Sequence, residues 1–325
     1  MYSYLAFFPI FLVFYFGYYI QYDKGEFIPE STFETRLQNI EVSDEENGLV
    51  QLGNIYEDDN EKLEAKLEEL GIKSRKSYDC IIGRDDNKCS DENIQELISM
   101  YTGWDEIDIL NNKVGNIVKF EYFKEVYNYT SFPSFLSILT KISLFSTISK
   151  LEDGNEDLEG ILLYKKIGDK LINGDISIYG IQRLISILEN SLNNIDYILN
   201  NYDLSNDTLN LLKRELDQNY NTENILINSI KVEYNSSKYF IDRDTNSNML
   251  FNKNELLNIK RNIWLKVING EEQSEYEKNY CKRTYIYNFL GAYRYSGISS
   301  EREWIDKLNI KIENILEKIE DKLNN

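Results

Sequence analysis

The chain has 325 residues, with 55 acidic against 36 basic side chains and a formal net charge of −19. This excess of negative charge disfavours nucleic acid and anionic lipid headgroups as partners, because their phosphates would be repelled. No histidine occurs in the sequence, which excludes nucleophiles that need an imidazole base and the usual zinc and haem ligand sets.

The first stretch, residues 2–22, carries no charged side chain and ends just before Asp23. A helix of about 20 apolar residues, each rising about 1.5 Å, crosses the hydrocarbon core of a bilayer. Tyrosines gather at both ends of the stretch, where their rings would lie in the headgroup layers. We therefore predict a transmembrane anchor over residues 1–22. The alternatives are a cleaved signal peptide, although no basic start or small-residue cleavage site is present, and a buried helix of a globular domain.

Residues 23–60 are polar and weakly periodic, and contain Pro29 and the turn pair Asn47-Gly48. We predict an extended connector here. Gly48 indicates a backbone position that needs a positive φ or close packing, or else a flexible loop.

Cys80 and Cys89 bracket the polar stretch CIIGRDDNKC. A disulfide between them would close a ring of about ten residues and contribute roughly 2–3 kcal/mol to stability. It would also require an oxidising compartment, so the bulk of the chain would lie outside the cytoplasm. The alternative is a pair of free thiols in a cytosolic loop. The third cysteine, Cys281, is expected to be a buried thiol.

Apolar residues recur at helical spacing over residues 61–325, which predicts a mainly α domain, an irregular multi-helix bundle of stacked helical hairpins. The clearest amphipathic pattern lies between Ile181 and Leu199, with Asn, Glu and Ser on the opposite face. Ser205 and Thr222 are expected to begin two further helices. The final stripe alternates spacings of three and four and predicts a helix folded back on the domain rather than a coiled-coil dimer. Its members are Ile305, Leu308, Ile312, Ile315 and Ile319.

Few residues in the sequence indicate a catalytic, cofactor-binding or metal-binding site. No glycine-rich phosphate loop occurs, and no catalytic residue, cofactor or cofactor-binding residue is predicted. A candidate cation loop alternates oxygen-bearing side chains as a calcium loop does, but Ser247 replaces its turn glycine and Lys253 replaces its closing glutamate. Its residues are Asp242, Asp244, Asn246 and Asn248. An ordinary turn between helices is the alternative.

Three features together resemble a group of uncharacterised single-pass bacterial envelope proteins. They are the segment EENGLVQLGNIYEDDNEKLEAKLEELG, the pair Cys80 and Cys89, and the segment YIYNFLGAYRYSG with Asn288 and Gly291. The resemblance implies a helical extracytoplasmic domain anchored in a membrane. It implies no activity. We expect a single pass through the bacterial inner membrane, with the bulk of the chain in the periplasm or otherwise outside the cytoplasm.

Our functional hypothesis is a non-enzymatic envelope protein that contacts the lipid bilayer through residues 2–22 and binds an envelope protein partner as an interaction or scaffold module. Two alternatives stay open. One is a histidine-free hydrolase of envelope polymers that uses paired carboxylates. The other is a ligand-binding accessory domain.

Overall fold

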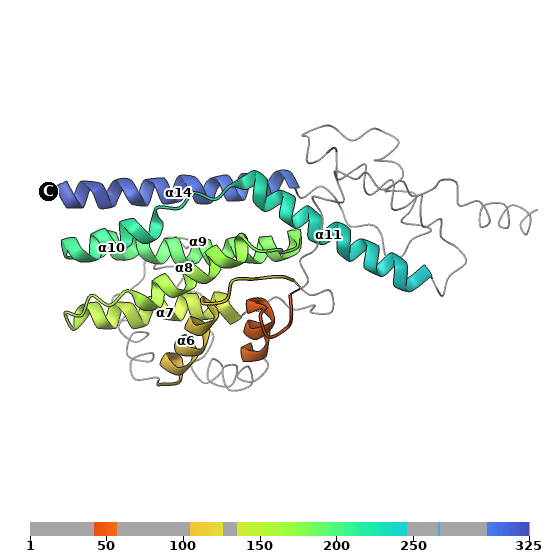
Figure 1. The fold of residues 1–325 in the computed structure, drawn as a ribbon. Coiled ribbons are helices and arrows are strands. Elements are labelled where there is room, and N and C mark those ends of the chain that lie inside the picture. Colours follow the sequence, from red (N-terminus) through yellow and green to blue (C-terminus); the bar gives the residue numbers. More distant parts are fainter. Residues whose placement is uncertain (1–41, 57–104, 126–134, 246–265, 267–297, 325) are drawn as a thin grey trace, which may run out of the picture. The chain divides into compact units, whose positions relative to one another are not determined.

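The computed structural model describes residues 42–56, 105–125, 135–245, 266 and 298–324 (Figure 1). The regular elements within these ranges are α-helices, joined by loops that contain two isolated parallel β-bridges. The prediction of a mainly helical chain is confirmed for this part. The chain divides into two compact units, one made of Glu41–Ser229 with Ile298–Asn325 and the other of Met1–Ile40 with Ile230–Gly297. The first of these is called the helical unit below.

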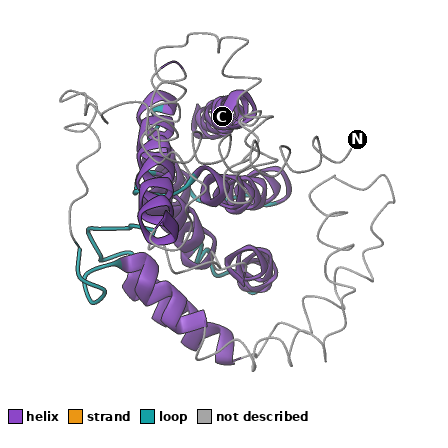
Figure 2. Cartoon of the chain, turned by 90° about the vertical axis from the view of Figure 1, so that its right-hand side faces the viewer, coloured by secondary structure: helices purple, strands orange, loops and turns teal. Residues whose placement is uncertain are grey.

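In chain order the helices of the described ranges are residues 48–56, α6 (Asp105–Ile117), α7 (Phe135–Glu152), α8 (Glu159–Ile172), α9 (Ile178–Asn201), α10 (Asn206–Leu216), α11 (Thr222–Thr245) and α14 (Ile298–Asn324). Helices α7 to α11 follow one another through short connections (Figure 2). The sequence patterns predicted helices over α7 to α10, the first turns of α11, and α14. They did not predict α6, which packs against α8. The hydroxyl of Tyr164 on α8 donates to Oδ1 of Asn111 on α6 over 2.5 Å and links the two helices.

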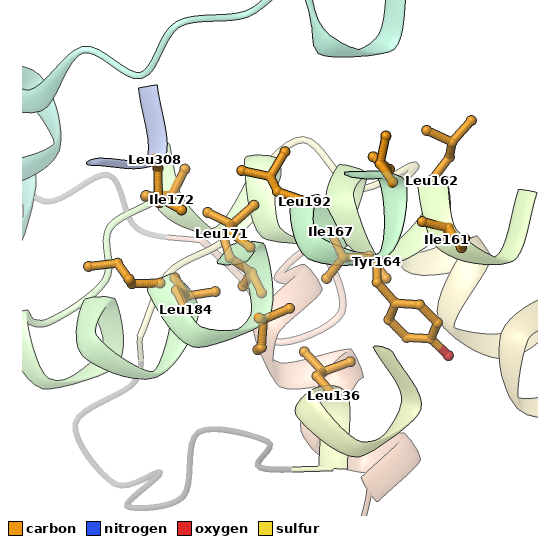
Figure 3. Close-up of a cluster of buried hydrophobic side chains, with 14 of the residues drawn as sticks. Leu136, Ile161, Leu162, Tyr164, Ile167, Leu171, Ile172, Leu184, Leu192 and Leu308 are labelled. Atoms are coloured by element: carbon orange, nitrogen blue, oxygen red, sulfur yellow. The ribbon is translucent and has the colours of Figure 1, made fainter. Parts of the chain in front are cut away.

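Helix α9 lies at the centre of the helical unit and packs against α7, α8 and α14. Its predicted apolar stripe is buried throughout, and Figure 3 shows Leu184 and Leu192 among the core side chains of the other helices. Of the polar residues of this helix, Asn190, Ser191 and Asn194 are buried as well. The physical reason is that α7 covers the face of α9 that carries them. The Asn194 amide, for example, donates to the Thr140 backbone carbonyl on α7 over 2.7 Å.

Helix α14 packs along α9 and α10. All five residues of its predicted stripe, from Ile305 to Ile319, are buried, and burying a side chain of this size contributes roughly 1.5–3 kcal/mol. The prediction of a helix folded back on the domain is confirmed. The C-terminal residues of the chain therefore complete a core that begins about 250 residues earlier, at Leu49 and Leu52.

The predicted extended connector over residues 23–60 is wrong for residues 48–56, which are helical. Three residues of this helix, Leu49, Val50 and Leu52, are buried. Its start is fixed by Asn47, whose side-chain oxygen accepts from the backbone N–H of Leu49 over 3.1 Å and from that of Lys124 over 3.0 Å. Because Lys124 lies 77 residues further along the chain, the local sequence could not reveal this support.

Gly48 begins the same helix in close contact with the loop that follows α6. A Cβ added at Gly48 would lie 2.6 Å from ring atoms of Phe123, and the Gly48 backbone N–H donates to the Tyr122 carbonyl over 2.9 Å. A residue larger than glycine at this position would require the Phe123 ring to shift. Of the interpretations considered for Gly48, close packing is the correct one.

The predicted anchor over residues 1–22, the predicted Cys80–Cys89 disulfide and Cys281 lie outside the described residues, so all three stay predictions. Among the helices that the structure does describe, none combines the length and the apolar character needed to cross a bilayer.

Candidate functional site

A lysine with no exposed surface lies in the middle of α8. The Lys165 side chain is 0% exposed, and its ammonium group lies 2.7 Å from Oδ2 of Asp169, one helical turn further on. It also donates to the backbone carbonyl of Glu215 at the end of α10, over 2.6 Å. A buried ammonium group needs such partners, because leaving water without them costs several kcal/mol. Lys165 thus ties α8 to the end of α10.

Asp169 is the counter-ion of Lys165, and its side chain is 12% exposed. Its second oxygen, Oδ1, accepts from the hydroxyl of Tyr220 over 2.6 Å. Burial raises the pKa of Asp169, and the Glu215 charge raises it further, while the ion pair with Lys165 and the Tyr220 hydroxyl act in the opposite direction. Burial also raises the pKa of Tyr220, helped by the Asp169 charge, so the phenol keeps its proton and donates.

Tyr220 extends this network to α14. Its backbone N–H donates to Oδ1 of Asn309 over 2.8 Å, and the Asn309 amide donates back to the Tyr220 carbonyl over 3.0 Å. Lys165, Asp169, Tyr220 and Asn309 are called the buried polar cluster below. It joins three parts of the chain: α8, the link between α10 and α11, and α14.

The geometry of the buried polar cluster suits a structural role. The Lys165 ammonium and the Asp169 carboxylate face each other, and their further hydrogen bonds go to groups of the chain itself. Lys165 is fully enclosed, so a reactant could reach its amine only after α8 and α10 separate. Buried ion pairs of this kind contribute little net stability, whereas losing one member leaves an uncompensated charge and is strongly destabilising.

Sequence reasoning missed the buried polar cluster, although one signal was present. Lys165 stands four residues after Ile161 and three after Leu162, within the apolar stripe of α8, and Asp169 follows at the spacing of a helical ion pair. A charged pair inside an apolar stripe could have been marked as buried. Tyr220 and Asn309 gave no such signal, because they lie 51 and 140 residues beyond Asp169.

A second polar group lies where the α7–α8 and α9–α10 connections meet. The Glu156 carboxylate accepts from the hydroxyl of Ser205 over 2.6 Å and from that of Thr208 over 2.5 Å, and from the Ser205 backbone N–H over 3.0 Å. These hydrogen bonds, led by that of the Ser205 hydroxyl, lower the pKa of Glu156. Ser205 also caps α10, as predicted, by accepting from the Thr208 backbone N–H over 3.3 Å.

Several carboxylates surround this junction. We use the term acidic end for its exposed members, Glu152, Asp153, Glu159, Asp203 and Asp207. The α14 helix ends nearby, since the ammonium group of Lys322 lies 3.9 Å from Asp203. Burial and the negative charges of Tyr197 and Glu152 raise the pKa of Tyr202, in the α9–α10 connection, to about 12. The acidic end therefore carries five exposed carboxylates, with the Lys322 ammonium group beside one of them.

The predicted cation loop is only partly described. Asp242 and Asp244 lie in α11, which continues to Thr245, so the expectation of a loop is wrong for residues 242–245. Once a helix is nucleated, each added residue gains a backbone hydrogen bond, so a polar sequence can extend it. Asn246 and Asn248 lie outside the described residues, and the cation site stays a prediction. Within the described ranges, no group of three or more Cys, Asp or Glu side chains is placed to hold a metal ion.

Comparisons of the chain with protein-family models, with curated proteins and with solved structures found no significant match.

Proposed function

We propose that the chain is a membrane-anchored protein-interaction or scaffold module whose helical unit receives a basic partner at the acidic end. The observation that supports this proposal is the way hydrogen bonds hold the two connections of the acidic end together. Glu156 holds two connections together through three hydrogen bonds within 3.0 Å, and exposed carboxylates stand on both connections.

Such an end is suited to recognition because its charges are held on ordered backbone. Ser205 fixes the first turn of α10 beside Asp207, and Lys150 pairs with Asp157 over 2.6 Å in the other connection. A pre-organised surface loses less conformational entropy when a partner binds. A negative field also speeds the encounter with a positively charged surface, and this effect weakens as salt is added.

The location of the protein is part of the same proposal. Residues 2–22 would anchor the chain in a bacterial inner membrane, with the helical unit outside the cytoplasm. Mass spectrometry of the non-reduced protein tests this part, since a disulfide-linked peptide pair containing Cys80 and Cys89 is expected. Free thiols at both positions in protein taken directly from cells would contradict it.

The binding proposal is tested by charge reversal at the acidic end. The double variant Asp153→Lys with Asp207→Lys changes one residue on the α7–α8 connection and one in the first turn of α10. Crosslinking in intact membranes followed by purification of the full chain should recover a basic partner with the wild-type protein, and at least about tenfold less with this variant, because close charge reversals at an interface cost several kcal/mol.

A matched control makes the same change of charge elsewhere. Asp44 and Glu121 are exposed and flank the contact between Gly48 and Tyr122. Lys170, in the last turn of α8, donates to the Phe120 carbonyl over 3.4 Å, which places Glu121 near the opposite end of α8 from Glu159. The variant Asp44→Lys with Glu121→Lys should recover the partner as the wild type does. Equal losses in the two variants, or no reproducible partner for the wild type, would overturn the proposal.

A further inference from the structure

The link between α10 and α11, together with the first residues of α11, runs beside the first half of α14, and three polar contacts join the two segments. Tyr220 meets Asn309 through both of its backbone groups, the Thr222 hydroxyl donates to Asp306 over 2.8 Å, and Glu223 pairs with Arg302. The partners on α14 fall at successive spacings of three and four, so they occupy one face of the helix. Along this face the link and α14 run in opposite directions.

The apolar stripe of α14 does not define its position along α9 and α10 uniquely. Ile305, Ile312 and Ile319 repeat every seven residues, and so do Leu308 and Ile315. A shift of α14 by one heptad would therefore place apolar residues opposite much of the same surface. In helix pairs with such repeats, a single polar residue can select one register. Asn309 is placed to do so, because only one register brings its amide to Tyr220.

We propose that the buried ion pair of α8 controls the register of α14 along α9 and α10, and that it acts through Tyr220. The Asp169 carboxylate holds the Tyr220 hydroxyl and thereby fixes the ring and the backbone to which it is attached. That backbone presents its N–H and carbonyl to Asn309. The buried polar cluster is thus a latch in which Asp169 and Asn309, which do not bond to each other, are energetically coupled. Tyr220 and Asn309 position α14 in this latch.

The latch also has a consequence for the rest of the chain. The polypeptide leaves the helical unit after Ser229 and returns to it at Ile298. Because the latch joins the link before α11 to the first half of α14, it holds the departing and returning parts of the chain next to each other. This inference does not depend on the acidic end or on any partner.

Hydrogen exchange of the full-length protein, followed by mass spectrometry, tests the coupling. Tyr220→Phe removes one oxygen atom and leaves the backbone bonds to Asn309 possible, while Asn309→Ala removes those bonds directly. Each change should speed exchange in the first half of α14 by about tenfold through local opening, and leave α9 unchanged. If the two residues act in one latch, the double variant should exchange at least about fivefold more slowly than the product of the single effects.

Lys318→Ala provides the control on the same helix. Lys318 bonds to Asp196 over 2.5 Å and Asn200 over 3.3 Å on α9, away from the latch. If the two sites are independent, the exchange rate of the double variant Lys318→Ala with Tyr220→Phe should rise by the product of the two single increases. The proposal is overturned if Tyr220→Phe and Asn309→Ala also multiply independently, or if Tyr220→Phe speeds exchange in α9 as much as in α14.

Discussion

Two carboxylates of the helical unit have similar partners but opposite electrostatic behaviour. Asp169 and Glu156 each accept a hydrogen bond from a hydroxyl at 2.6 Å, yet the pKa of Asp169 is raised and that of Glu156 is lowered. The two carboxylates differ in how much water surrounds them. Asp169 has lost most of its water, whereas Glu156 keeps much of its hydration and adds hydrogen bonds to it. A hydroxyl hydrogen bond to a carboxylate therefore helps to position packed segments in the interior, and it helps to fix the start of α10 at the surface.

The largest effect is expected from removing the cation of the interior pair. Lys165→Met leaves the Asp169 charge buried without a counter-ion, and should lower the free energy of unfolding by about 3–5 kcal/mol. Urea unfolding of the full chain, followed by circular dichroism, measures this loss.

The exposed ion pair of Lys213 with Glu320, at 2.8 Å between α10 and α14, supplies the comparison. Lys213→Met removes a similar side chain and should cost less than about 1 kcal/mol, because water already solvates both charges. Equal losses for Lys165→Met and Lys213→Met would mean that burial does not distinguish the two pairs.

A smaller effect is expected at the surface junction. Ser205→Ala removes the N-cap of α10 and one hydroxyl donor to Glu156, and should cost about 1 kcal/mol, as is typical for loss of a capping serine. Ser205→Asp keeps a capping oxygen but places a second carboxylate beside Glu156, so it should rescue stability only in part. Full rescue by Asp would show that the hydrogen bond to Glu156 is unimportant.

The sequence predicted the helices whose stripes face the core, and it could not predict contacts between distant segments. Ile161 and Leu162 on α8, and Ile305 to Ile319 on α14, are buried as their spacing indicates, since periodic apolar residues report directly on the buried face. The helix over residues 48–56 was missed because Lys124 and Phe123 support it from outside its own sequence. Tyr220 and Asn309 of the buried polar cluster were missed for the same reason, whereas the spacing of Lys165 and Asp169 within α8 was a local signal that was overlooked.

The smallest effects are expected from pH. Because the pKa of Glu156 is lowered in the folded protein, its contribution to stability is present above the ordinary glutamate pKa and is lost as the pH falls through the folded-state value. Because the pKa of Asp169 is raised, its contribution is fully present below the ordinary aspartate pKa and is lost as the pH rises through the folded-state value.

Acidification from about pH 6 to about pH 3 therefore separates the two carboxylates. Unfolding free energies measured over this range should fall less steeply for Glu156→Gln than for the wild type, and more steeply for Asp169→Asn. Slopes that change in the same direction for both variants would contradict the contrast between the two carboxylates.

The contrast is tested most directly by following the carboxyl carbons of Asp169 and Glu156 by ¹³C NMR as the pH is lowered, with assignment by Asp169→Asn and Glu156→Gln. The account predicts that Asp169 gains its proton above about pH 3.9, the ordinary aspartate value, and that Glu156 gains its proton below about pH 4.3, the ordinary glutamate value. An Asp169 that stays ionised below its ordinary value would contradict the account.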